Sequence, residues 1–132
     1  MDFLVDGHHT YCYTGGKPFD AAKPTLLFLH GVLNDHSVWG LQTRYFANHG
    51  FNVLAPDLPG HCRSAGAPPA SVEEGARFAL ALLDAAGVQQ AAWAKRVLRT
   101  VLVLAGGWGA TEVSCPGCFA GAQFIHFLLG RA

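Results

Sequence analysis

The sequence predicts an α/β fold of three layers, in which a mainly parallel sheet lies between flanking helices. Residues 25–29 and 52–55 form continuous apolar runs, as expected of strands that are covered on both faces. Helical segments separate these runs from one another and from a later apolar run at residues 100–105. A strand, a helix and a returning strand form a right-handed crossover between parallel strands. Helices joined in this way pack against the central sheet.

Composition limits the classes of protein that remain. The chain has 132 residues, of which 51% are hydrophobic and only 14% are charged, where about 25% is typical of soluble domains. This length predicts a single domain or part of one. Nine basic residues balance nine acidic ones, so no long-range field attracts nucleic acid or an anionic membrane. We expect neither as a partner.

The N-terminus carries no sign of export. Its first residues, MDFLVDGHHT, have neither the basic start nor the apolar run of a signal peptide. No apolar stretch approaches the roughly 20 residues that span a bilayer. We therefore expect a cytoplasmic protein whose four cysteines are free thiols.

The first half of the chain predicts a hairpin, a strand and a helix. Residues 3–5 and 10–13 are β-prone and flank Asp6-Gly7, a turn pair. The strand at residues 25–29 follows, and then a helix from about residue 37 to residue 48, with Gly50 placed to cap its end. Four residues supply the predicted apolar stripe of this helix: Trp39, Leu41, Tyr45 and Phe46.

The second half begins with the strand at residues 52–55 and a well-marked helix. Ser71 is the predicted N-cap, and Glu74 three residues on completes a capping box. The helix continues to Gly87 with a predicted apolar face made of Val72, Ala76, Ala79, Leu80 and Leu83. The run at residues 100–105 predicts a further strand, and residues 119–129 predict a short apolar helix.

The central strand ends in a motif with possible chemistry. Leu29-His30-Gly31-Val32 places a glycine where backbone can approach a ligand, so that the following N–H groups can face a developing negative charge. Taken alone, this motif also fits a plain turn that ends a strand.

A second motif gives the first its context. After the next strand stands Pro56-Asp57-Leu58-Pro59-Gly60-His61-Cys62-Arg63-Ser64. A strand, His-Gly, a helix with a tryptophan, a strand and this motif together resemble the N-terminal part of an α/β-hydrolase, over roughly residues 3–92. That family contains esterases, lipases and C–C bond hydrolases. Cys62 stands where the family commonly has glycine.

The resemblance implies a site and a substrate class. The backbone N–H of Val32 would be one oxyanion donor, and the expected oxyanion-hole and substrate-binding residues are His30, Gly31, Val32, Leu33, Asn34 and Trp39. Trp39 is also interpreted as a core residue. The implied ligand is a small ester or related carbonyl compound, with no cofactor and no metal. Asp57 and Arg63 are interpreted as structural, and His36 as a surface residue.

The catalytic residues of that family are not identifiable in this chain. A serine hydrolase carries its nucleophile in Gly-x-Ser-x-Gly after a strand, and none of the serines, Ser37, Ser64, Ser71 and Ser114, has that setting. The turn formed by this Gly-x-Ser-x-Gly motif is the nucleophile elbow. We expect that the elbow was skipped through a deletion, an altered splice or a frameshift. The predicted domain is therefore incomplete, with a family-like core at residues 1–92 and a divergent segment at residues 93–132. Residues 100–105 should then take the vacant place beside residues 25–29.

Three classes of function remain open. The first is an incomplete and inactive serine hydrolase, and the second is a binding remnant that has lost its chemistry. The third is a thiol oxidoreductase that would use Cys115 and Cys118, because a Cys-x-x-Cys pair can have a lowered thiol pKa. The chain has no thioredoxin-like framework, so we predict no redox role.

Overall fold

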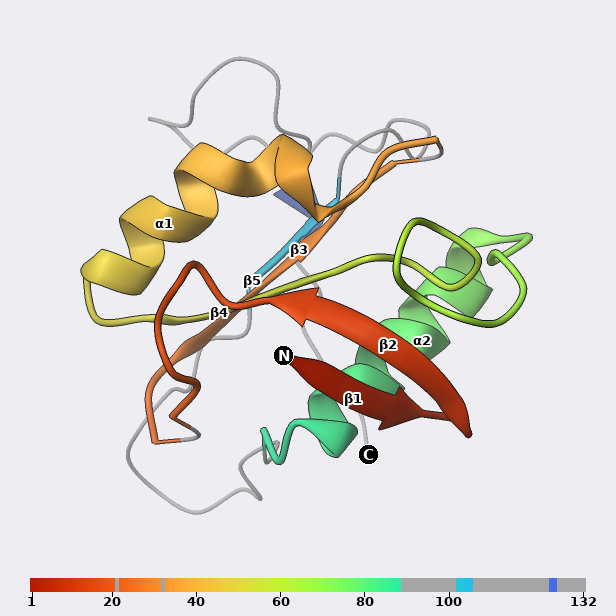
Figure 1. Cartoon of the computed structure of the whole chain (residues 1–132), viewed down its shortest axis with the longest axis horizontal. Coiled ribbons are helices and arrows are strands. Elements are labelled where there is room, and N and C mark those ends of the chain that lie inside the picture. The colour runs from red at the N-terminus through yellow and green to blue at the C-terminus, as the bar shows by residue number, and fades with distance from the viewer. Residues whose placement is uncertain (21, 32, 89–101, 106–123, 126–132) are drawn as a thin grey trace.

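In the part of the chain that the structure describes, a six-stranded sheet has helices on both faces (Figure 1). The computed structural model describes residues 1–20, 22–31, 33–88, 102–105 and 124–125. The strands are β1 (Asp2–Val5), β2 (His8–Tyr13), β3 (Thr25–Leu29), β4 (Asn52–Pro56), β5 (Leu102–Ala105) and β6 (Phe124–Ile125). A 3-10 helix, η1 (His36–Trp39), leads into α1 (Gly40–Asn48), and α2 (Val72–Ala85) follows β4.

The centre of the sheet is parallel. The strand order is β1-β2-β4-β3-β5-β6, in which β4, β3 and β5 run parallel while the outer pairs are antiparallel. Leu26 faces Leu102 and Leu29 faces Ala105 in the register of β3 with β5. The prediction that the late apolar run lies beside β3 is therefore confirmed.

The predicted helix at residues 119–129 is wrong at the two positions that the structure describes. Phe124 and Ile125 form β6, which pairs antiparallel with Val103 and Leu104 of β5. This pairing satisfies backbone groups along the outer edge of β5, and Phe and Ile have high β propensity. The outer edge of β5 needs backbone hydrogen-bond partners, and this need accounts for a strand at residues 124–125.

The two helices cover opposite faces of the sheet. Leu27 and Leu54 belong to the core cluster that α2 closes, whereas Phe28 and Val53 belong to the cluster under η1 and α1. Successive side chains of a strand point to opposite faces, so one continuous apolar run serves both cores. The predicted three-layer α/β class is confirmed.

The opening hairpin also forms as predicted. Asp6 and Gly7 both have positive φ, 49° and 79°, which is the requirement of the two-residue turn that matches the twist of paired strands. β1 then pairs with β2, and β2 joins the hairpin to the edge of β4.

The predicted apolar stripe of α1 is only partly correct. Leu41 is 77% exposed and Tyr45 is 57% exposed. Thr43 is buried instead, and its hydroxyl is satisfied there by a hydrogen bond that it donates to the Trp39 carbonyl over 2.7 Å. The cap prediction is confirmed: the chain turns at Gly50, where φ is +88°, and the next N–H bonds back to the carbonyl of Phe46.

The start of α2 is capped as predicted, and its predicted inner face is correct in part, at Ala79 and Leu83. Ser71 Oγ accepts from the Glu74 N–H over 3.2 Å, and the Glu74 carboxylate accepts from the N–H of Ala70. Val72 is 49% exposed. The buried residues are Gly75, Phe78, Ala79, Leu82 and Leu83, so the helix is rotated to turn Phe78 and Leu82 toward the sheet. Among the described residues, no helix has both the length and the apolar character to cross a membrane.

Candidate functional site

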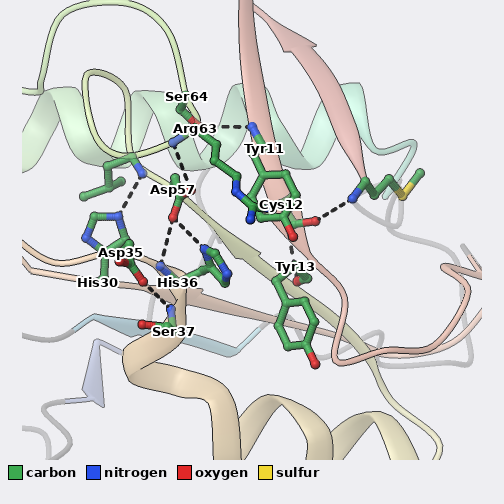
Figure 2. A network of polar contacts seen from close by, with 12 residues as sticks. Tyr11, Cys12, Tyr13, His30, Asp35, His36, Ser37, Asp57, Arg63 and Ser64 are labelled. Carbon is green, nitrogen blue, oxygen red and sulfur yellow. Dashed lines mark hydrogen bonds and ion pairs between the residues drawn. The ribbon is translucent and has the colours of Figure 1, made fainter.

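The chemistry-bearing loops lie where β3 and β4 end. Parallel strands have their carboxyl ends at the same edge of a sheet, and β3 and β4 are neighbours. The loop of residues 30–35 therefore lies beside the turn of residues 57–64. Figure 2 shows the polar contacts that join these loops to each other and to β2.

His30 links the two loops from inside the protein. Its side chain is fully buried, Nδ1 donates to the Gly31 carbonyl over 2.8 Å, and Nε2 accepts from the Leu58 N–H over 2.9 Å. This assignment follows from the hydrogen-bond network, because a backbone N–H can only donate. Burial holds the pKa of His30 below its ordinary value of 6.5. The ring is therefore a neutral brace at the base of the predicted oxyanion loop.

Asp57 makes a second link. Its buried carboxylate accepts from the His36 N–H at 2.9 Å and from His36 Nδ1 at 2.8 Å, both through Oδ1, while Oδ2 accepts from the Arg63 N–H at 3.3 Å. These bonds give Asp57 the structural role that the sequence predicts. The prediction that His36 is a surface residue is wrong, because its side chain is only 18% exposed and lies near the rings of Tyr11 and Tyr13.

Three side chains at this place could in principle hold a cation. Ligand atoms of Asp35, His36 and Asp57 lie within 4.8 Å of one another. Their oxygens already have partners, since Asp35 Oδ1 accepts from the Ser37 N–H at 2.7 Å and Asp57 Oδ1 accepts twice from His36. Hydrogen bonds to the Ser37 side chain and backbone also lower the pKa of Asp35. The cluster is thus accounted for as bracing of the loop.

The turn after β4 is anchored to β2. The guanidinium of Arg63 lies over the Tyr11 ring, 4.6 Å from its centroid, and Ser64 Oγ accepts from the Tyr11 N–H over 3.0 Å. His61 Nδ1 donates to the Pro59 carbonyl over 3.0 Å, as expected of a side chain that caps this turn. Cys62 has a φ of +42°, in the left-handed region where glycine is unstrained, which explains why a glycine suits this position.

Most of the predicted site residues that the structure describes share the loop after β3. Gly31 is buried, Leu33 is 93% exposed with a φ of 64°, and the Asn34 N–H donates to the Gly31 carbonyl over 3.3 Å. Val32, the predicted donor, lies outside the described residues, as do Cys115, Cys118, Ser114 and His126.

Trp39 lies apart from that loop, in the core between η1 and the sheet. It is 7% exposed, and its ring packs against Phe28 with the centroids 5.6 Å apart. Its indole N–H has no partner among the described residues. The structure therefore places Trp39 in the core, and its role in substrate binding stays a prediction.

The chain belongs to the α/β-hydrolase fold family. The family model described as "alpha/beta hydrolase fold" matches residues 24–94. This range includes both loops and the elements that flank them, β3, η1, β4 and α2. The family resemblance of the sequence and its fold class are thereby confirmed.

Similar proteins support this assignment over parts of their length. The chain is 31% identical over 69 residues to an "AB hydrolase superfamily protein" of Gibberella zeae, covering 52% of this chain and 24% of that protein. Among solved structures it is similar to epoxide hydrolase VrEH1 from Vigna radiata, with a TM-score of 0.60, 25% identity and coverage of 83% of this chain and 32% of that one.

A hydrolase from Thermoplasma acidophilum, described as predicted and CIB-like, has the same fold. Its TM-score is 0.63 at 20% identity, with coverage of 80% of this chain and 49% of that one. The chain thus spans between a quarter and a half of the length of these relatives.

Proposed function

We propose that this chain is the oxyanion-loop part of a hydrolase of esters or related carbonyl compounds, and that it does not hydrolyse esters by itself. The observation that carries the proposal is that hydrogen bonds hold the loop after β3 at both of its ends. His30 bonds to the Leu58 N–H, and Asp57 bonds to the His36 N–H and side chain. A loop held at both ends is what a preorganised backbone donor needs, because fixed donors cost no reorganisation when charge develops.

The serines of the described part of the chain have other roles. Ser64 Oγ is occupied by the Tyr11 N–H and its residue is 8% exposed, and Ser71 Oγ caps α2. Ser37 follows the N-cap Asp35 at the start of η1, and a hydrogen bond joins the two side chains. None of the three lies between glycines after a strand. These assignments support a chain without a serine nucleophile.

The loss of the elbow removes more than the serine. Acyl transfer needs an activated nucleophile, a base within hydrogen-bond reach of it and donors for the oxyanion. The second donor N–H of this family comes from the residue after the nucleophile, and loss of one donor costs about 10²–10³ in rate. The Val32 N–H alone would leave a slow reaction even if another nucleophile were present.

Turnover of p-nitrophenyl acetate and butyrate by the purified chain tests the proposal. We expect no saturable turnover and no labelling by a fluorophosphonate probe. Val32→Pro, which removes the donor N–H, should leave the background rate unchanged. Saturable turnover that Val32→Pro reduces, together with labelling of Ser37, Ser64, Ser71 or Ser114, would overturn the claim that the chain is inactive.

The hydrolase of which this chain would form a part has one alternative substrate class, the epoxides. The Vigna radiata neighbour is an epoxide hydrolase, so hydrolysis of an epoxide such as styrene oxide to its diol should be tested beside the esters. A binding remnant is the competing function, and saturable binding of an ester without its turnover would favour it.

A cytoplasmic location is part of the proposal, and expression of a tagged chain followed by fractionation tests it.

A further inference from the structure

A cavity of about 370 Å³ lies beneath the opening hairpin, on the face of the sheet that α2 covers. The hairpin contributes Val5 and Thr10, the loop after β4 contributes Pro59 and Ala67, and α2 contributes Phe78. Of the described residues that line it, none belongs to the loop of residues 30–36. The cavity therefore lies apart from the loop after β3, although Pro59 of the turn after β4 borders it, and what it binds goes beyond the proposed function.

The inner wall is apolar except for one hydroxyl. Val5 is 3% exposed, Phe78 is 7% exposed and Thr10 is 1% exposed. Thr10 is almost fully buried as a residue and lines the cavity. Among the described residues, the buried side-chain polar atom without a partner is Trp39 Nε1, so the Thr10 hydroxyl is not a buried group left unpaired. It is the hydroxyl that the inner wall offers to a ligand, and a hydroxyl can both donate and accept.

Charge is confined to the rim. Asp6, His8, Glu74 and Arg77 line the cavity from exposed positions, where the Arg77 and Glu74 side chains are 73% and 45% exposed and lie 3.9 Å apart. These charges are of both signs and remain in water. No charged side chain lies among the buried residues Val5, Thr10 and Phe78. An ionised ligand group carried to the inner wall would lose its hydration without finding an opposite charge there.

We propose that this cavity binds a small, neutral, largely apolar alcohol, with the ligand hydroxyl bonded to Thr10. The apolar body would pack against Val5, Phe78 and Pro59, which are contributed by three different segments. The volume lies at the small end of the roughly 300–1,000 Å³ that ligand pockets occupy, so a one-ring aromatic alcohol is a suitable size.

Titration of the full ¹⁵N-labelled chain with benzyl alcohol tests this proposal by NMR. We expect saturable shifts at the amides of Val5, Thr10, Ala67 and Phe78, with weaker binding of toluene, benzoate and benzylamine. Thr10→Val should weaken benzyl alcohol binding by about 3- to 10-fold, as loss of one neutral hydrogen bond does, and leave toluene unchanged. Thr10→Ser, which keeps the hydroxyl, should bind as the natural chain does.

A pair of variants on one loop separates filling of the cavity from general disturbance. Ala67 and Ala65 are both exposed, and only Ala67 lines the cavity. Ala67→Phe should abolish the saturable shifts, and Ala65→Phe should preserve them; this comparison still decides if Thr10→Val fails to fold. Shifts that do not saturate, that persist in Ala67→Phe, or that benzoate or benzylamine produce to the same extent at equal concentration overturn the proposal.

Discussion

His30 Nε2 accepts a hydrogen bond from the backbone N–H of Leu58 over 2.9 Å, and both residues are within 1% of complete burial. The bond joins the end of β3 to the turn after β4. Because water reaches neither partner, loss of the imidazole leaves a buried N–H without an acceptor.

His30→Phe should therefore lower the free energy of unfolding by about 1–3 kcal/mol, the cost of one buried donor left unpaired. Urea denaturation followed by circular dichroism measures this change. His49→Phe is the matched control at an exposed position, where a change within about 0.5 kcal/mol is expected. Equal midpoints for the two variants would contradict the role assigned to His30.

The same residue makes stability depend on pH. Burial lowers the pKa of His30 below 6.5, so the imidazole is neutral in both states above about pH 6.5. As the pH falls below this value, the unfolded chain binds a proton that the folded chain resists, and the free energy of unfolding decreases.

His30→Gln removes this titration while keeping a side-chain acceptor. The stability of the natural chain relative to His30→Gln should decrease between pH 7 and pH 5, as measured by urea denaturation at each pH. A constant difference over this range would show that His30 does not resist protonation.

Cys62→Gly should stabilise the chain. The φ of +42° at Cys62 strains any residue with a Cβ by about 1–3 kcal/mol, and glycine returns about 0.5–1 kcal/mol of this through the greater freedom of its unfolded state. We expect a net gain of about 1 kcal/mol, or about 3–5 °C in Tm, by calorimetry. Cys62→Ala removes only the thiol, so an equal gain in that variant would rule out backbone strain as the cause.

The two cysteines that the structure describes should differ in reactivity. Burial raises the pKa of Cys12 to about 12, and desolvation and the nearby Asp57 carboxylate raise the pKa of Cys62 as well, but Cys62 is exposed to the reagent and Cys12 is buried. In a Cys115→Ser/Cys118→Ser background at pH 8, Ellman's reagent should label Cys62 within minutes and Cys12 only after urea is added, because the thiolate is the reacting form. Labelling of Cys12 in the native chain, detected by mass spectrometry, would contradict its burial.

The elements that sequence analysis predicted correctly depend on local chemistry. Thr25–Leu29 is a strand because five consecutive buried residues fit between two covering layers, and its predicted bounds match those observed. Ser71 caps α2 because its hydroxyl reaches an N–H only three residues away. Each of these signals lies within a few residues of sequence and does not depend on where distant residues lie.

The faces of the helices were predicted less well, because packing on the sheet sets their rotation. Leu41 is the more apolar residue, yet Thr43 is buried, since Trp39 and Phe46 pack against Phe28 and fix which side of α1 turns inward. Propensity and periodicity contain no information about the position of Phe28.

The bond between His36 and Asp57 was also missed, because the two residues are 21 positions apart. A signal was present: each residue follows one of two adjacent parallel strands, whose carboxyl ends meet at one edge. Only the strand order, with β3 next to β4, turns this signal into a contact.

The alternation of side chains along β3 has a consequence for the whole molecule. Leu27 and Leu29 face the cluster under α2, while Leu26 and Phe28 face the cluster under α1. Loss of either cluster uncovers one face of this strand, so we expect the two clusters to melt together rather than as independent subdomains. The amide protons of β3 should consequently be among the slowest to exchange with solvent, and their exchange rates should approach those set by global unfolding.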